Sequence, residues 1–281
     1  MKEGISLVKK RNRLRLLMTM LVFVVVLSAC GTGEISASST GVWEVIVYNF
    51  ARAIKWLSIG GSRGLGIILF TILTRIILLP LMHFQTKSMR KTQDVQPKVK
   101  QLQKKYASKD IETQQKLREE TQKLYAEHGV NPYAGCLPLL VQMPILMAVY
   151  QAISRVPELR EGSFLWIKVL GEPDPYFILP ILAAIFTFGS TYLSSMSQVE
   201  ANASLKVMNY VMPIMILVMA INLPSALSLY WVISNAFQVG QTLLINNPFK
   251  IIKEREAVAK AERDRIKALQ KAQNPKKKRK K

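Results

Sequence analysis

Cysteine and histidine are scarce in this 281-residue sequence, which contains two of each. A lone pair of cysteines, Cys30 and Cys136, does not make a disulfide framework. His83 and His128 lack the spacing of metal ligands, so we expect no metal site. Neither a Walker motif nor a zinc-protease motif occurs, which argues against an ATPase and an intramembrane metalloprotease.

Acidic residues are also few, because 18 Asp and Glu accompany 39 Lys and Arg and leave a net charge of +21. Such an excess suggests an anionic partner, such as nucleic acid, ribosomal RNA or an anionic membrane surface. The charges alternate in blocks with long apolar stretches, and 49% of the residues are apolar. This distribution predicts a membrane protein with several transmembrane helices.

The first thirty residues have the organisation of an export signal. A basic stretch at 9–15 precedes a mostly apolar run of 14 residues at 16–29, too short to span a bilayer. The run ends in Leu27-Ser28-Ala29-Cys30, which resembles the lipobox of bacterial lipoproteins. We expect residues 1–29 to be a lipoprotein signal peptide and Cys30 to be acylated on the outer face of the membrane. The alternative is an ordinary signal peptide with a chance cysteine.

Residues 30–62 predict a lipidated tether followed by an amphipathic helix. Gly31-Thr32-Gly33 and the polar stretch 36–40 are typical of a flexible segment. Between 41 and 59, Arg52 and Lys55 lie on the side opposite to the apolar residues, and we interpret this stretch as a helix on the outer leaflet. A packed, partly buried helix is the alternative, and the two are compatible. The apolar side comprises Trp43, Ile46, Val47, Phe50, Ile54 and Leu57.

Five transmembrane spans are predicted within a core at 63–245. The first three lie at 64–84, 133–153 and 176–195, and the stretch 207–245 carries no charge over 39 residues. Asn222-Leu223-Pro224 interrupts that stretch, so we expect two short helices joined by a tight turn. Each would be near the lower limit for crossing a hydrocarbon core of about 30 Å.

A charged helical hairpin is predicted at 85–131, between the first two spans. Asp110 is a candidate cap for its second helix, with Glu112 in the first turn. Apolar residues at coiled-coil spacing would join the two arms: Val95, Val99, Leu102, Tyr106, Leu117 and Leu124.

The charges of the connecting segments predict the orientation of the spans. The hairpin carries eleven Lys and Arg, and the tail at 246–281 carries fourteen with four acidic residues. The loop at 155–175 has three basic and four acidic residues. The positive-inside rule therefore predicts a cytoplasmic hairpin and tail, an external loop and an external N-terminus.

One cation, Arg75, interrupts the first span at its middle, twelve positions from Arg63 and from Lys87. Insertion scales put the cost of a central arginine at about 2.5–3.5 kcal/mol. No Asp or Glu occurs within any predicted span, which nearly excludes an ion pair inside the membrane. We therefore expect a water-filled cavity lined by uncharged polar groups.

Other spans carry polar residues that could line such a cavity. For each of them a hydrogen bond between helices is the simpler interpretation. Three polar stripes together with Arg75 favour a hydrated groove within the bilayer. The stripes are Gln142 and Gln151 in the second span, Thr187, Ser190, Thr191 and Ser194 in the third, and Trp231, Ser234, Asn235, Gln238 and Gln241 in the fifth.

Three motifs, in order, carry a family resemblance. NPYAGCLPLLVQMPI at 131–145 and PSALSLYWVISN at 224–235 resemble the second-span and last-span signatures of the YidC/Oxa/Alb membrane-protein insertases. Thr74-Arg75 followed by Pro80 fits the first span of that family. The resemblance covers essentially all of 41–245. The lipobox and the absence of a large external domain resemble the Gram-positive lipoprotein branch, SpoIIIJ/YidC-like.

The resemblance implies an all-α membrane protein with five helices around a hydrophilic groove, open to the cytoplasm and to lipid. It also implies an insertase and chaperone in the bacterial cell membrane that works alone or with the Sec translocon, as a monomer, without a cofactor or covalent catalysis. Arg75 would transiently attract acidic or polar residues in the short external segment of a nascent membrane protein. The predicted groove residues are Arg75, Gln142, Thr187, Ser190, Trp231, Ser234 and Gln238.

The basic tail leaves two partners open. Residues 251–273 predict a helix and 276–281 are all basic, which suits either ribosomal RNA phosphates or anionic lipid of the inner leaflet. Two rival functions also stay open. A small-solute transporter or channel would tend to show internal repeats and more spans, which are absent here. A chaperone that acts only beside the translocon would need that partner for every substrate.

Overall fold

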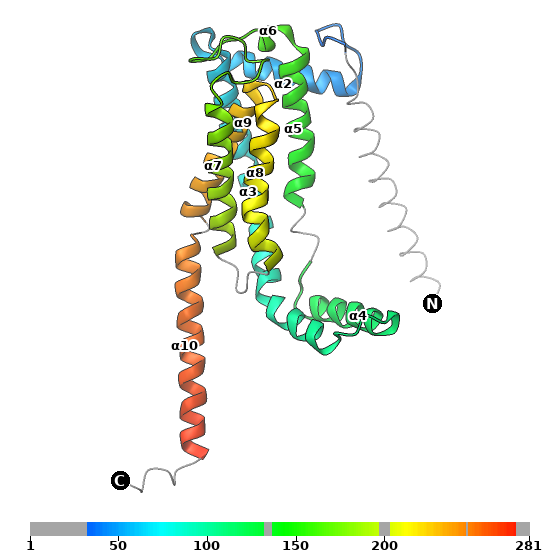
Figure 1. Ribbon diagram of the computed structural model, residues 1–281, viewed down its shortest axis with the longest axis vertical. Helices are drawn as coiled ribbons and strands as arrows, with labels where there is room; N and C mark the ends of the chain where they lie inside the picture. The colour runs from blue at the N-terminus through cyan, green and yellow to red at the C-terminus, as the bar shows by residue number, and fades with distance from the viewer. Residues whose placement is uncertain (1–32, 132–136, 197–202, 246, 274–281) are drawn as a thin grey trace. The chain divides into compact units, whose positions relative to one another are not determined.

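The computed structural model describes residues 33–131, 137–196, 203–245 and 247–273, so the predicted signal peptide, Cys30 and Cys136 lie outside the described residues. The described part is helical apart from turns and one isolated bridge between Phe164 and Ile167. Its α-helices, shown in Figure 1, are α2 (Val42–Trp56), α3 (Arg63–Lys105), α4 (Ile111–Glu127), α5 (Leu137–Arg155), α6 (Pro157–Arg160), α7 (Ile178–Met196), α8 (Ala203–Ile221), α9 (Ser225–Leu244) and α10 (Pro248–Gln273).

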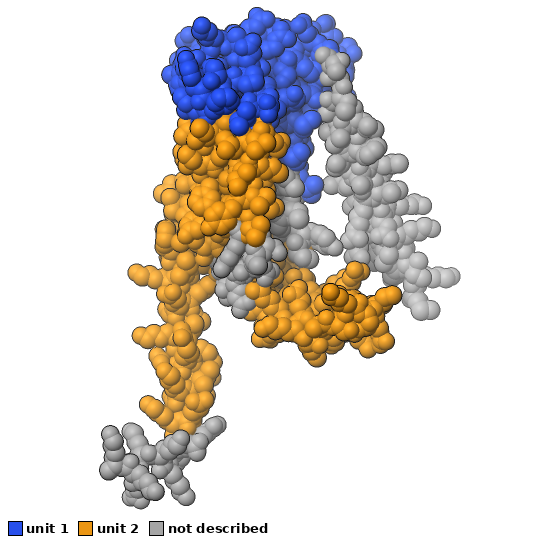
Figure 2. Space-filling model, viewed as in Figure 1, with its two compact units in different colours: residues 1–74, 138–179, 220–230 blue, residues 75–137, 180–219, 231–281 orange. Residues whose placement is uncertain are grey.

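The chain forms two compact units, coloured separately in Figure 2. Unit 1 comprises Met1–Thr74, Pro138–Leu179 and Ala220–Tyr230. Unit 2 comprises Arg75–Leu137, Pro180–Met219 and Trp231–Lys281. Several long helices therefore contribute one end to each unit.

The helix α3 runs without interruption for 43 residues, through residue 84, where the first predicted span ends and the predicted hairpin begins. At 1.5 Å per residue it is roughly 65 Å long. The predicted boundary rested on a change from apolar to charged residues, which alters the surroundings of a helix without breaking its hydrogen bonds. Pro80 and Pro97 both lie inside α3 and do not end it.

Two local predictions about the helical hairpin are confirmed. Asp110 caps α4, since its carboxylate accepts the Thr113 backbone N–H at 2.7 Å. Hydrogen bonds from the Ser108 hydroxyl and then from the Thr113 backbone lower the pKa of Asp110 to about 2. Val95 and Val99 of α3 are buried with Val130, and Leu124 and Tyr125 pack against them. The two arms therefore pack through part of the expected apolar seam.

The predicted break at residues 222–224 is also confirmed, because α8 ends at Ile221 and α9 begins at Ser225. The first amides of α9 are capped from the long loop, as Ser225 N–H donates to the Glu172 carbonyl at 2.7 Å and Ala226 N–H to the Leu170 carbonyl at 3.1 Å. Among the described residues, two helices, α3 and α7, are both long and apolar enough to cross a membrane. The apolar part of α8, Val207–Ile221, is shorter.

The amphipathic helix is α2, and it packs within unit 1. Trp43, Val47, Ala51 and Ile54 are buried along one side, and the Phe50 ring meets the Phe70 ring at 5.2 Å. The predicted packed helix is thus confirmed. Some apolar side chains of α2 nevertheless stay exposed, namely Val42, Val45, Ile46 and Trp56, and the prediction that α2 lies on a membrane surface stays open.

Glycine makes this packing possible. A Cβ at Gly66, near the start of α3, would fall on the Ile54 carbonyl oxygen of α2. That oxygen also accepts a hydrogen bond from the Ser58 hydroxyl at 2.8 Å. The two helices therefore approach closely only because residue 66 lacks a side chain.

Candidate functional site

The seven predicted groove residues belong to both units. Gln142, on α5, is in unit 1. The remaining six are in unit 2 and lie on three helices: Arg75 on α3, Thr187 and Ser190 on α7, and Trp231, Ser234 and Gln238 on α9. Neither unit by itself holds the whole set.

Arg75 is half-buried on the apolar part of α3. The neighbouring side chains Leu73, Ile76 and Ile77 are exposed to 44%, 49% and 65%. Large apolar side chains exposed to this degree on one helix are typical of a surface that meets lipid or an apolar partner. The arginine therefore lies beside an apolar surface.

The polar stripe of α7 is satisfied mainly within its own helix. Thr187 and Ser194 hydroxyls donate to the carbonyls four residues earlier at 2.6 and 2.7 Å. Ser190 donates to the Thr187 carbonyl at 3.0 Å and also meets the Asn235 side-chain oxygen of α9 at 3.3 Å. The simpler interpretation, a hydrogen bond between helices, is thus confirmed for Ser190.

Three side chains of unit 2, those of Gln85, Gln93 and Ser234, have buried polar atoms without a hydrogen-bond partner among the described residues. The Ser234 hydroxyl belongs to a residue that is 2% exposed, and both polar atoms of the Gln85 amide are buried with the residue 3% exposed. Buried polar groups in proteins are nearly always hydrogen-bonded. These atoms therefore need partners from outside the described residues. Gln85 was not predicted to be a functional residue. The only sign of such a role in the sequence is its amide side chain directly after the predicted first span.

Gln142 has a partner that the sequence did not reveal. Its amide Nε2 donates to the Tyr230 hydroxyl at 2.6 Å, which joins α5 to α9 inside unit 1. Tyr230 is 2% exposed. The position of Tyr230 next to Trp231 in the last-span motif was the available signal, but 88 residues separate it from Gln142.

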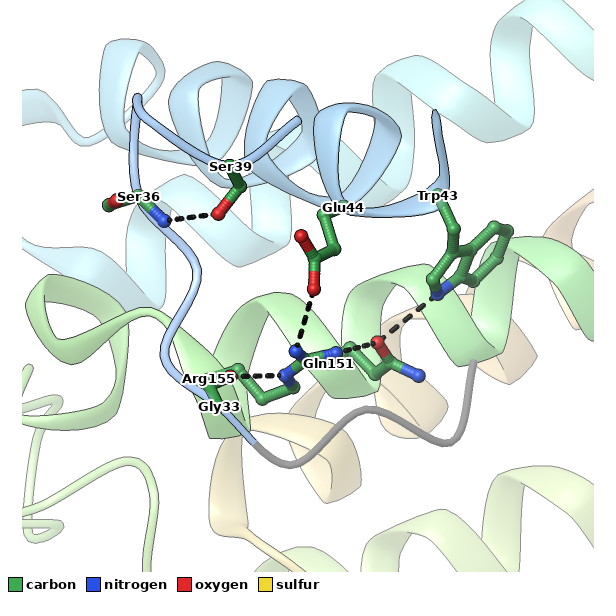
Figure 3. A network of polar contacts seen from close by, with 7 residues as sticks. All are labelled: Gly33, Ser36, Ser39, Trp43, Glu44, Gln151 and Arg155. Carbon is green, nitrogen blue, oxygen red and sulfur yellow. Dashed lines mark hydrogen bonds and ion pairs between the residues drawn. The ribbon is translucent and has the colours of Figure 1, made fainter. Parts of the chain in front are cut away.

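A buried arginine, Arg155, organises the polar contacts of unit 1 shown in Figure 3. Its guanidinium donates to the Gly33 carbonyl at 2.7 Å and to the Gln151 carboxamide oxygen at 2.9 Å. It also pairs with the Glu44 carboxylate at 3.2 Å. The Trp43 indole N–H donates to the same Gln151 oxygen at 3.1 Å. We call these five residues the Arg155 cluster.

The Arg155 cluster bears on two predictions, those for Gln151 and for the tether. For Gln151 the simpler interpretation, a hydrogen bond between helices, is confirmed, because its side-chain oxygen accepts the Trp43 indole N–H of α2 as well as the Arg155 guanidinium. The tether was expected to be flexible, yet Ile35 is 2% exposed and its N–H donates to the Arg155 carbonyl at 2.9 Å. Arg155 was predicted to begin the loop at 155–175, whereas it is the last residue of α5. Its position four residues after Gln151 was a usable signal for a contact along the helix.

The loop after α6 is held by a buried carboxylate. Asp174 is 1% exposed and accepts the Trp166 indole N–H at 2.9 Å and the Leu179 backbone N–H at 2.8 Å. This ties the loop to the first turn of α7. Among the described residues no group of three His, Cys, Asp or Glu could hold a metal ion.

Comparison with known proteins identifies the family. Residues 56–254 match the family described as 60Kd inner membrane protein. The chain is 69% identical over 274 residues to "Membrane protein insertase YidC" of Enterococcus faecalis (strain ATCC 700802 / V583), covering 97% of this chain and 99% of the relative. It is 56% identical over 249 residues to "Membrane protein insertase YidC 1" of Lactococcus lactis subsp. lactis (strain IL1403), covering 89% and 92%.

A solved structure is also similar. The "Active YidC insertase crystal structure with the first transmembrane domain resolved" superimposes with a TM-score of 0.58 at 30% identity. The match covers 73% of this chain and 47% of that one, so this chain spans about half of its length. The chain therefore belongs to the YidC family of membrane protein insertases.

Proposed function

We propose that this protein inserts newly made membrane proteins into the cell membrane through a hydrated groove among five spans, centred on Arg75. The observation that carries the proposal is the placement of Arg75 on α3, half-buried beside exposed apolar side chains. A guanidinium in that setting can attract an acidic or polar segment while the apolar surface accepts the substrate helix. Gln142, Thr187, Ser190, Trp231, Ser234 and Gln238 would line the groove.

The activity needs no covalent step. Burial of apolar area in lipid, at about 25 cal/mol per Å², drives a substrate helix into the membrane. The barrier is the polar segment that must cross first, because charged groups are expensive at the bilayer centre. Arg75 would lower this barrier as a temporary binding partner. It would therefore act as a binding residue and not as a catalytic one.

Partnerless polar atoms in unit 2 support hydration of the groove. The Gln85 amide and the Ser234 hydroxyl lie buried without partners among the described residues. Water or a substrate backbone can supply hydrogen bonds to both groups. Burying these groups in an entirely apolar helix bundle, without a hydrogen-bond partner, would cost free energy.

The membrane topology is part of the proposal. We place an acylated Cys30 and the 155–175 loop outside, and the hairpin 85–131 and the tail 246–281 in the cytoplasm. The excess of basic residues in the hairpin and the tail supports this orientation. The Sec translocon would be a partner for some substrates. The tail would contact either ribosomal RNA or anionic lipid.

Reconstitution tests the proposal directly. The purified protein is placed in liposomes without a translocon, and a small single-span substrate with an acidic external segment is added. We expect protease-protected substrate in these liposomes. Absence of insertion without the translocon would contradict independent action and favour a chaperone that works only beside it.

A further inference from the structure

Unit 1 contains a cavity, lined by both charged and apolar side chains, that has no role in the proposed groove. Its volume is about 940 Å³, and it lies between α2, residues 35–37 of the tether and the segment that follows α5. Its lining includes Tyr48, Arg52, Lys55 and Trp56 from α2 and Glu158 from α6. Every lining residue belongs to unit 1.

The cavity lies close in the chain to the polar ends of two apolar helices, α3 and α5. Its α2 residues shortly precede the start of α3 at Arg63, and its 156–159 residues directly follow the end of α5 at Arg155. The two ends are at one level, because the Arg63 side chain donates to the Glu158 carbonyl at 3.3 Å. In a membrane protein this level corresponds to the interface between hydrocarbon and headgroups.

The charges of the cavity suit an anion. Lys55 pairs with Glu158 at 2.5 Å, and this hydrogen bond lowers the pKa of the Glu158 carboxyl. The carboxylate is thus neutralised by one cation. Arg52, one turn before Lys55 on the same helix, adds a second cation to the lining. A guanidinium can donate two parallel hydrogen bonds to a phosphate.

Trp56 in the cavity lining, and exposed apolar residues of α2 and the following turn that lie outside the lining, suit lipid. Trp56 lines the cavity and is 83% exposed, while Val42 is 82% exposed and Ile59 67%. Tryptophan is enriched where its indole can sit between hydrocarbon and headgroups. A soluble anion would not contact this apolar surface. An amphiphile would contact both the cations of the cavity and the apolar surface.

We propose that this cavity binds the headgroup of an anionic phospholipid, with the phosphate on Arg52 and the acyl chains along the exposed apolar side of α2. Such a lipid would hold α2 at a defined depth in the interface. The site is independent of the groove, because it uses neither Arg75 nor any other groove residue.

Native mass spectrometry of the purified full-length protein tests the proposal. The wild type is mixed with phosphatidylglycerol or phosphatidylcholine, and retained lipid is counted for each. Arg52→Gln removes the cation, and Ala37→Trp fills the cavity without changing the charge. Lys168→Gln is the matched control, since it removes one exposed cation of unit 1 outside the cavity.

We expect preferential retention of phosphatidylglycerol by the wild type, with affinity about tenfold lower in Arg52→Gln, as for the loss of one charge-assisted contact. Ala37→Trp should also lose retention, and Lys168→Gln should retain lipid like the wild type. Unchanged retention in both cavity variants would overturn the proposal. Displacement of the lipid by an equal concentration of inorganic phosphate would also overturn it, by showing a site for a free anion. Because lipid retention is measured, failure of insertion in liposomes would leave the result intact.

Discussion

Arg155 and Arg75 show how differently the two units use an arginine. Arg155, in unit 1, is 9% exposed and bonds to a carboxylate, a carboxamide and a backbone carbonyl. Arg75, in unit 2, lies half-buried beside exposed apolar side chains of α3. The first holds the N-terminal segment and two helices together. The second is proposed to bind a substrate segment, so we expect stability to depend on Arg155 and insertion on Arg75.

Removal of Arg155 should have the largest effect on stability. Arg155→Ala leaves Glu44 without its ion-pair partner and Gln151 with the Trp43 indole as its remaining donor, and breaking this largely buried ion pair costs up to roughly 3 kcal/mol. Thermal unfolding of the purified protein in detergent measures the change, and Arg155→Lys should recover part of it. Arg160→Ala, at an exposed position of unit 1, is the control. Equal unfolding temperatures for Arg155→Ala and Arg160→Ala would show that the contacts of Arg155 do not stabilise unit 1 more than those of an exposed arginine.

Close packing in unit 1 should make glycine substitution costly there and harmless in unit 2. Gly66→Ala places a Cβ on the Ile54 carbonyl, and we expect a loss of about 2 kcal/mol from the resulting shift of α2. Gly240→Ala, on α9, meets nothing within 4 Å, so helix propensity should stabilise that variant by up to about 1 kcal/mol. Thermal unfolding of the two variants and the wild type measures both changes in stability. A destabilised Gly240→Ala protein would argue against open space around that position.

Substitution of Arg75 should change insertion more than stability. Loss of one charge-assisted contact predicts about tenfold slower insertion of a substrate with an acidic external segment in Arg75→Ala. Arg75→Lys keeps the charge and should be tolerated better. The measurement is protease protection of substrate in liposomes, with a neutral external segment as the control substrate. Equal activity of Arg75→Ala and wild type on acidic substrates would refute the electrostatic role.

Acid should weaken the helical hairpin of unit 2 by a small amount. The pKa of Asp110 is lowered to about 2 in the folded chain, below the value of about 3.9 for a free Asp. Its cap therefore contributes fully above pH of about 4 and is lost as the pH falls toward 2. Circular dichroism should record this loss of helix, and Asp110→Asn should flatten it. An identical acid response in that variant would assign the change to other groups.

Much of the fold could be predicted from local sequence. Asp110 acts within three residues, and the break at 222–224 uses a proline, so the relevant partners were visible in the sequence. The candidate site was harder to predict. Gln142 and Gln151 looked equivalent as polar residues of one span, yet the first bonds to Tyr230 and the second belongs to the Arg155 cluster.

The sequence by itself determined the apolar helices, the helical hairpin, the cap, the break and the family motifs, because each depends on neighbouring residues or on periodic exposure along one helix. Only the tertiary structure decided that α2 packs on α3 across Gly66, and that Arg155 meets Glu44 and Gly33, which are 111 and 122 residues away. Helical periodicity identifies which side of a helix is apolar or polar. It does not identify the partner, since that depends on how distant segments approach one another.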